Sequence, residues 1–166
     1  GNSWNVVNNN LNIQYPVTIS FLNNDTGFLS YNYTTGFATH HQFVEKTTDG
    51  GLSWSVIGTN WWFDKIQFIN HDNSYSIPGI LKINWGEMTM TNLRLNMLGC
   101  EQPAGLLFLN DTVGFVGGNG GEFPDIEAAI VKTTDGGSTF STKRFPSMYV
   151  ISSFYFVNKD IGYAVG

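Results

Sequence analysis

The sequence contains one cysteine and only two arginines, and charged residues make up 13% of its 166 positions. The single cysteine, Cys100, cannot form an internal disulfide, and we interpret it as a small buried hydrophobic residue. A net charge of −5 with so few arginines argues against nucleic acid and anionic membranes as partners, because both require a basic surface. No run of 18 apolar residues occurs, so no membrane-spanning helix is expected.

Long helical patterns are also missing, because the residues that favour them are scarce. The chain is instead rich in aromatic residues, with 13 Phe, 7 Tyr and 5 Trp, and it contains 19 Gly. Aromatic and β-branched residues interrupted by Gly, Asn and Asp are typical of strands joined by tight turns. A hydrophobic content of 42% suffices for a packed core in a chain of about one domain. The sequence therefore predicts an all-β fold.

Two internal repeats organise the chain. The segment Lys46–Trp54 (KTTDGGLSW) returns almost unchanged as Lys132–Phe140 (KTTDGGSTF). A second pattern, F-x-N-x-x-x-[GS]-[FY], occurs four times, and its leading phenylalanines are separated by 47, 40 and 48 residues. A period of about 40–50 residues with several strands per unit is typical of β-propeller blades. We expect the Asn and Gly of this second pattern to supply the unusual backbone angles of a hairpin turn.

The repeats predict about 3.5–4 four-stranded antiparallel blades, which can belong to a larger propeller. We expect blades near residues 17–57, 65–96 and 105–144, a partial blade at 152–166, and a strand at 3–8. The middle unit is degenerate, because Lys82–Met90 has Trp85 where the aspartate is expected and Ser74 replaces the glycine of the second pattern. Its second and third strands have a short connection, whereas Asn32–His41 and Asn119–Asp125 are expected to form longer loops. An incomplete fourth blade would leave unpaired edges, so we interpret the chain as a piece of a larger propeller or as one that closes with another copy, and a compact four-bladed ring stays open as an alternative.

The pattern [ST]-x-D-x-G-x-[ST]-[WF] resembles the Asp-box of sialidases, sortilin-type receptors and some glycoside hydrolases. With the F-x-N-x-x-x-G-[FY] pattern, the chain is most similar to the photosystem II assembly-factor-related (Ycf48-like) repeat family. The resemblance implies propeller blades and no particular activity. From the residues themselves, we expect each aspartate to accept backbone hydrogen bonds in its own turn, the glycine to adopt positive φ, and the final aromatic residue to pack between strands or blades. These structural residues are Thr47, Asp49, Gly51, Ser53 and Trp54, and Thr133, Asp135, Gly137, Thr139 and Phe140.

Catalysis is the less favoured hypothesis. Sialidase-like enzymes hold the substrate carboxylate with three arginines, and this chain has two. A glycoside hydrolase needs only two carboxylates across a cleft, so this alternative stays open. Its candidate acids outside the repeated turns are Asp64, Glu101, Glu122, Asp125 and Glu127.

The sequence gives little indication of a metal or phosphate site. His40 and His41 are adjacent, so on a strand they would point to opposite faces, and His71 is remote from both. The glycine-rich segment 117–121 has neither the G-K-[ST] ending nor the following helix of a phosphate loop, and we interpret it as a flexible loop. We expect no cofactor and no metal.

A non-catalytic binding or scaffold module is the function that the sequence favours. Exposed tryptophans can stack on sugars or anchor a protein partner, which makes Trp61, Trp62 and Trp85 candidate ligand-binding residues together with Glu122 and Asp125. Trp85 is the strongest of these, because it departs from the repeat. We expect a protein or glycan ligand, and a secreted, periplasmic or cell-surface location with any signal peptide removed.

Overall fold

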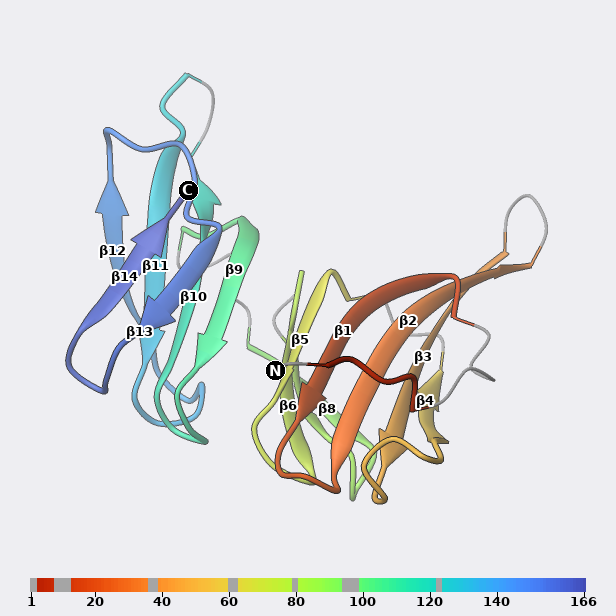
Figure 1. Cartoon of the computed structure of the whole chain (residues 1–166). Helices are drawn as coiled ribbons and strands as arrows, with labels where there is room; N and C mark the ends of the chain where they lie inside the picture. The colour runs from red at the N-terminus through yellow and green to blue at the C-terminus, as the bar shows by residue number, and fades with distance from the viewer. Residues whose placement is uncertain are drawn as a thin grey trace. The chain divides into compact units, whose positions relative to one another are not determined.

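A computed structural model describes residues 3–7, 13–35, 39–59, 63–78, 81–93, 99–121 and 124–166, and all regular structure in these ranges is β-strand (Figure 1). The prediction of an all-β fold is confirmed. Within the same ranges, no helix is long and apolar enough to cross a membrane.

Among the described residues, the strands form three four-stranded sheets and one two-stranded hairpin, and each pairing found there is antiparallel between strands adjacent in sequence. The first sheet contains β1 (Tyr15–Phe21), β2 (Gly27–Thr35), β3 (Thr39–Thr47) and β4 (Ser55–Thr59). The second contains β5 (Lys65–Phe68), β6 (Asn73–Ile77), β7 (Leu81–Asn84) and β8 (Thr89–Asn92). The third contains β9 (Gln102–Phe108), β10 (Gly114–Gly120), β11 (Glu127–Thr133) and β12 (Ser141–Phe145). The hairpin contains β13 (Ser153–Phe156) and β14 (Gly162–Val165).

The chain divides into two compact units, Gly1–Phe63 and Asp64–Gly166. The first unit contains the first sheet, and the second contains the other two sheets and the hairpin. A strand expected at residues 3–8 is not found in the described part, residues 3–7. Its absence has a physical reason: no ladder pairs these residues with another described strand, and Trp4 is 96% exposed.

The connections expected to be long loops are shorter than expected, because the neighbouring strands extend into both of them. In the first unit, β2 and β3 continue their ladder far beyond the expected strand ends, so that Tyr33 pairs with His41. In the second unit, Asn119 lies in β10 and pairs with Ala128. The backbone groups of the paired residues are satisfied by cross-strand hydrogen bonds, which a loop would have left to solvent.

An identical turn connects the first two strands of each sheet and the two strands of the hairpin. In every copy, the asparagine Oδ1 accepts two backbone N–H groups, at distances between 2.7 and 3.0 Å. These asparagines are Asn23, Asn70, Asn110 and Asn158. The expectation that Asn and Gly supply unusual backbone angles is wrong here, because positive φ is recorded for neither the asparagines nor the glycines of these turns. We call this structure the F-x-N turn.

In the first sheet, the third sheet and the hairpin, the glycine that follows the F-x-N turn provides space for the motif phenylalanine. Phe21 pairs with Gly27 across the hairpin, and a Cβ on Gly27 would lie 2.7 Å from the Phe21 ring. The same arrangement joins Phe108 with Gly114 and Phe156 with Gly162. A side chain at these glycines would displace the ring, so the aromatic residue and the glycine form one packing element.

The core of the second unit lies between its sheets. Ile77, Cys100, Val116, Ala129 and Val131 form a buried cluster in which Cys100 is 1% exposed. Burial raises the pKa of the Cys100 thiol to about 11, so the thiol stays protonated near neutral pH. The interpretation of this cysteine as a buried hydrophobic residue is therefore confirmed.

Polar side chains connect the strands of the second unit across sheet boundaries. Gln67 of β5 donates from Nε2 to the Phe108 carbonyl at 2.8 Å, and its Oε1 accepts the Phe108 N–H at 2.7 Å. Lys65 donates to the carbonyls of Ala104 and Ser152 at 2.6 and 3.0 Å. These bonds place β5, β9 and the start of the hairpin in fixed register.

Candidate functional site

The two T-T-D-G-G turns, Lys46–Trp54 and Lys132–Phe140, are closed by their own side chains. Asp49 accepts from the Ser53 N–H at 2.9 Å through Oδ1 and from the Ser53 hydroxyl at 2.5 Å through Oδ2. Thr47 donates its hydroxyl to Asp49 at 2.8 Å and accepts the Gly51 N–H at 2.9 Å. The carboxylate is thus fully engaged within one turn.

The second copy repeats this geometry closely. Asp135 accepts from the Thr139 N–H at 2.8 Å and from its hydroxyl at 2.6 Å, and the Thr133 hydroxyl donates to Asp135 at 2.9 Å. The hydroxyl of residue 53 or 139 is the largest cause that lowers the pKa of each aspartate to about 2. Both carboxylates are therefore ionised acceptors at neutral pH, a state suited to holding a turn and unsuited to giving or taking a proton.

The glycines and aromatic residues of these turns have the geometry that the sequence predicted. Gly51 has φ of 92° and Gly137 has φ of 91°, values that favour glycine. Trp54 donates from Nε1 to the Gly51 carbonyl at 3.1 Å and meets the Phe21 ring edge-on, and Phe140 packs against the core cluster of the second unit.

Each sheet also couples its two turns by one backbone hydrogen bond. Gly50 donates to the Asp25 carbonyl and Gly136 donates to the Thr112 carbonyl, both at 2.9 Å. In the second sheet, which lacks the aspartate, the Trp85 N–H donates to the Asp72 carbonyl at 2.6 Å. The backbone hydrogen bond between the two turns is therefore present even in the sheet that lacks the turn aspartate.

The lysine that opens the T-T-D-G-G pattern has a role that we did not infer from sequence. Lys46 lies over the Phe28 ring, Lys82 over Tyr75 and Lys132 over Phe115, with Nζ between 5.6 and 5.8 Å from the ring centroid. The residues of each pair are direct cross-strand neighbours. The sequence indicates this contact only through the lysine and the aromatic residue that recur in each of the three sheets. The strand register was needed to show that the two residues are cross-strand neighbours.

Trp85 does not offer a ligand-stacking surface, so the hypothesis that it is an exposed binding residue is wrong. It is 7% exposed, it stacks on Phe68 with ring centroids 5.8 Å apart, and its Nε1 donates to Ser74 Oγ at 2.9 Å. The two residues that depart from the repeat, Ser74 and Trp85, are therefore hydrogen-bonded to each other. The turn itself has only four residues between paired Asn84 and Thr89, and Asn84 Oδ1 accepts the Glu87 N–H at 3.0 Å.

The remaining sequence candidates are only partly brought together. Glu101 and Glu127 lie at one end of the third sheet, because Glu101 donates its N–H to the Asn119 carbonyl and Glu127 pairs with Gly120. Asp125 is exposed near the same end, and Glu127 forms an ion pair of 3.8 Å with Arg144. Asp64 is exposed at the start of β5, whereas Trp61, Trp62 and Glu122 lie outside the described residues.

The histidines and the glycine-rich segment do not form a site. In the described part of the chain, no group of three or more His, Cys, Asp or Glu side chains is placed to hold a metal ion. Gly117, Gly118 and Gly120 belong to strand β10, so the interpretation of this segment as a flexible loop is wrong. They are small because neighbours approach closely: a Cβ on Gly118 would lie 2.8 Å from Cys100 Sγ.

Sequence reasoning also missed a pair in the first sheet between half-buried Tyr31 and buried Glu45. The Tyr31 hydroxyl donates to Glu45 Oε1 at 2.8 Å, while no described atom partners Glu45 Oε2. Burial and this bond raise the pKa of Tyr31 above its usual range. Tyr31 therefore acts as a donor to the carboxylate.

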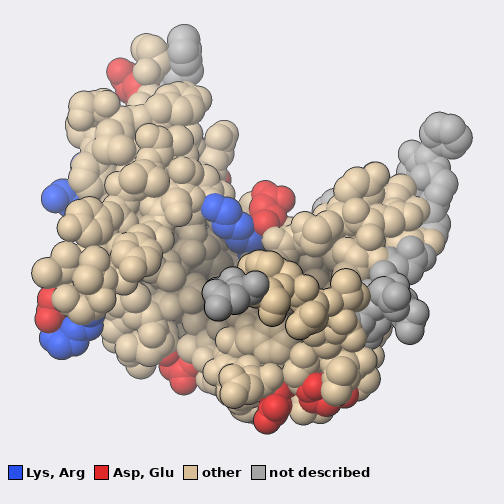
Figure 2. Space-filling view, in the orientation of Figure 1, with Lys and Arg blue, Asp and Glu red and all other residues tan. Residues whose placement is uncertain are grey.

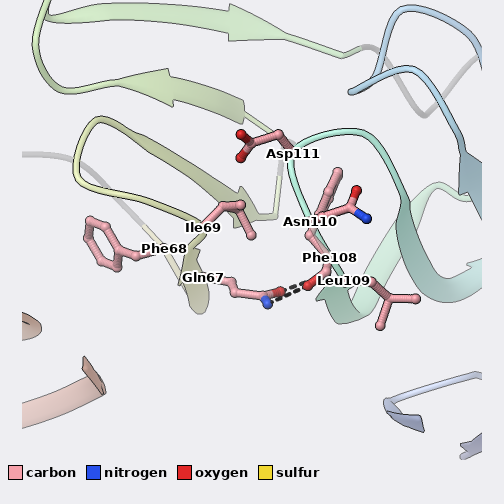
Figure 3. Close-up of a pocket in the computed structure, with 7 residues that line it drawn as sticks. All are labelled: Gln67, Phe68, Ile69, Phe108, Leu109, Asn110 and Asp111. Carbon is pink, nitrogen blue, oxygen red and sulfur yellow. Dashed lines mark hydrogen bonds between the residues drawn. The ribbon is translucent and has the colours of Figure 1, made fainter. Parts of the chain in front are cut away.

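Two grooves lie in the second unit, beside the F-x-N turns. One, of about 340 Å³, lies between the second and third sheets and is shown in Figure 3. There, Gln67 reaches across to the Phe108 backbone. At the same boundary, the Asn70 amide Nδ2 donates to Asp111 Oδ1 at 3.0 Å. The other, of about 520 Å³, lies between the third sheet and the hairpin. We call it the Lys132–Lys159 groove, and its lining residues are Leu109, Asn110, Val113, Lys132, Thr134, Phe156, Asn158 and Lys159.

The Lys132–Lys159 groove is rich in hydrogen-bond donors. Lys159 follows Asn158 in its turn as Asp111 follows Asn110, so a cation stands where the neighbouring groove has an accepting carboxylate. The structure gives the Nδ2 groups of Asn110 and Asn158 no acceptor within the described residues. Lys159 itself pairs with exposed Asp160 at 2.8 Å, and Lys132 lies over Phe115.

Charged side chains are sparse over the molecule, as the face in Figure 2 shows, so two lysines beside one groove are a local concentration.

Comparisons of the chain with protein-family models, with curated proteins and with solved structures give no match.

Proposed function

We propose that this chain is a non-catalytic binding or scaffold module of a secreted or cell-envelope protein, built from Asp-box β-propeller blades. The repeated antiparallel sheets and the two closed T-T-D-G-G turns support the blade assignment. The aspartates of these turns accept hydrogen bonds within their own turns, so we expect a ligand to bind at other surfaces.

The observation that carries the proposal is the mismatch in the Lys132–Lys159 groove. Between the second and third sheets, the Asn70 amide is satisfied by Asp111. At the next boundary, Lys159 holds the sequence position of Asp111, and it lines the same groove as Asn110; both side chains can donate hydrogen bonds there. Asp160 accepts from Lys159, whereas an acceptor for the Asn110 amide would come from water or a ligand, and Leu109, Val113 and Phe156 provide apolar contact beside it.

The ligand chemistry that fits is an acceptor-rich group, best a carboxylate, next to an apolar surface. Lysine binds carboxylates as a point charge, and asparagine amides add direction. Such a group occurs on acidic glycans and on acidic peptide segments. The proposed partner is therefore a glycan or protein that carries carboxylates.

The test is retention on arrays of acidic glycans and acidic peptides, followed by calorimetry on the best binder. Lys159→Asp would supply the acceptor found at Asp111, satisfy the Asn110 amide and remove the cation, so binding should weaken at least tenfold. Lys143→Asp makes the same charge change on exposed β12 and should leave binding within about twofold of wild type.

Two outcomes would contradict the proposal. If Lys159→Asp and Lys143→Asp weakened ligand binding equally, the effect would come from the overall charge of the chain and not from the groove. Release of product from the glycan panel, lost on replacing Glu101 and Glu127 together by glutamine, would instead support a glycoside hydrolase.

A further inference from the structure

The two F-x-N turns that border the Lys132–Lys159 groove use their backbone donors internally. In the third sheet, the Leu109 N–H donates to the Val113 carbonyl at 2.9 Å, and Asn110 Oδ1 accepts the N–H groups of Thr112 and Val113. In the hairpin turn, the corresponding N–H groups are engaged in the same way, and they belong to Val157, Asp160 and Ile161. An extended peptide is bound mainly through the free main-chain groups of a strand edge. These turns do not offer such an edge, so recognition in the groove depends on side chains.

The amide groups of Asn110 and Asn158 are held in one orientation. Each Oδ1 accepts two backbone N–H groups of its own turn, so each Nδ2 is directed away from these bonds. An amide Nδ2 carries two donors, and both hydroxyl and carboxylate oxygens accept from it. The two oriented amides therefore suit a ligand that carries hydroxyl groups beside its carboxylate.

Phe156 gives the groove an apolar surface in a fixed position. Its ring lies 2.7 Å from the place that a Cβ on Gly162 would take, and its centroid is 4.8 Å from that of Phe115. Leu109 and Val113 line the groove from the third sheet. A sugar ring packs on such a surface through its C–H groups, while the hydroxyl groups at its rim reach polar side chains.

The charges along the groove have one sign. The described residues that line it include Lys132 and Lys159 and no Asp or Glu, in a chain with a net charge of −5. The neighbouring groove is lined by Asp111 and by no lysine. Asp160 pairs with Lys159 at 2.8 Å, but both side chains are exposed, and water weakens such a pair. A carboxylate of a ligand can therefore replace Asp160.

We propose that the ligand of this groove is a glycan that contains uronic acid, an inference that rests on the function proposed above. The carboxylate of one uronate residue pairs with Lys132 and Lys159. Its hydroxyl groups accept from the amides of Asn110 and Asn158, and its ring packs on Phe156. The groove volume of about 520 Å³ lies within the range of about 300–1,000 Å³ that is usual for small-ligand sites. An acidic peptide supplies the carboxylate but not the rigid ring with its hydroxyl groups.

Calorimetry with matched probes tests this inference. The probes are short oligosaccharides of galacturonate, glucuronate or mannuronate, the methyl esters of the same oligosaccharides, and tetraglutamate. The best uronate should bind roughly tenfold more tightly than its methyl ester, because the ester keeps the ring and loses the charge. It should also bind roughly tenfold more tightly than tetraglutamate, because the peptide keeps the charge and has neither the ring nor its hydroxyl groups.

A variant of one asparagine tests the role of the amides. Asn110→Asp keeps an oxygen that accepts the backbone N–H groups of the turn and removes the amide donors, so binding of the best uronate should fall roughly fivefold or more. Asn23→Asp is the matched control, because it makes the same change in the F-x-N turn of the first sheet and Asn23 does not line the groove. It should bind within about twofold of wild type. Thermal melts establish that both variants are folded, and Asn158→Asp replaces Asn110→Asp if the latter is not.

The inference is overturned if the best uronate binds no better than its methyl ester or than tetraglutamate, or if the variant and its control bind equally. Tetraglutamate binding that Lys159→Asp abolishes, without binding of any uronate, would identify an acidic peptide as the ligand and would leave the proposed function intact. Absence of binding by all of these probes and by the glycan and peptide arrays would overturn both.

Discussion

The turn between the last two strands is built in two ways within one unit. In the third sheet, eight residues lie between paired Lys132 and Ser141, and Asp135 organises them through hydrogen bonds from Thr133 and Thr139. In the second sheet, four residues lie between Asn84 and Thr89, and the buried Trp85 stabilises this turn by stacking on Phe68. The longer turn is held by polar bonds at the surface, and the shorter one by packing in the core.

The comparison shows that a departure from a repeat can be a complete structural replacement. Trp85 and Ser74 satisfy one another, so nothing at this turn is left for a ligand. At Lys159, by contrast, the departure leaves the Asn110 amide without an acceptor among the described residues, and Lys159 pairs with the adjacent exposed Asp160. Function is therefore better sought where a substitution leaves groups unmatched than where the motif is merely missing.

The largest effect should come from breaking the packed turn. Trp85→Ala removes a buried aromatic side chain from its stack on Phe68, and truncations of this kind cost about 3–5 kcal/mol. Urea unfolding would measure this loss. Trp4→Ala is the matched control and should change the free energy of unfolding little, since Trp4 is 96% exposed.

Trp85→Asp sharpens the same comparison. Restoring the repeat residue should not restore stability, because the four-residue turn lacks the Thr and Ser/Thr partners that engage Asp49 and Asp135. A Trp85→Asp variant as stable as wild type would contradict the replacement account.

Removing the partner of the tryptophan should have the next largest effect. Ser74→Ala leaves the buried Trp85 N–H without its acceptor, at a cost of about 1–3 kcal/mol. In a Trp85→Phe background, which has no indole N–H, the same change should cost much less. Additive losses in this double-mutant cycle would show that the two residues are independent.

The polar turn should be weaker and sensitive to acid. Asp135→Ala should lower the melting temperature by about 2–4 °C at pH 7. Because the pKa of Asp135 is lowered to about 2, its contribution is present above pH 4 and is lost as the pH falls towards 2. Thermal melts of wild type and variant should therefore converge at low pH, and a difference that stays constant down to pH 2 would refute this role.

The smallest effect should come from the lysine shared by all three sheets. Lys132→Gln removes the cation above Phe115 and should cost about 0.5–1 kcal/mol. Lys132→Arg keeps the cation and should retain most of the stability. If the glutamine and arginine variants melted together, the ring contact would be incidental.

The sequence was sufficient to predict the sheets and their turns, because these depend on local patterns. Asp49 and Asp135 repeat with their hydroxyl partners, and hydrogen bonds within one turn follow from such spacing. The positive φ of Gly51 and Gly137 follows in the same way. The F-x-N turns were located correctly, although their asparagines act through the side chain and not through the backbone angle.

The candidate site depends on contacts between sheets, and these contacts cannot be predicted from the pattern of a single sequence. Trp85 stood out as an isolated departure because its partner, Ser74, lies 11 positions away on another strand. The significance of Lys159 emerged only when Asn70 and Asp111 were found bonded at the equivalent boundary.

The central claim is that the turn aspartates serve structure and that binding depends on the unmatched groove. Calorimetry with the best acidic ligand tests it directly, by comparing an Asp49→Asn/Asp135→Asn double variant with Lys159→Asp under conditions in which both are folded. The account predicts affinity within about twofold of wild type for the double variant and at least a tenfold loss for Lys159→Asp. A tenfold loss in the double variant with normal binding by Lys159→Asp would contradict it.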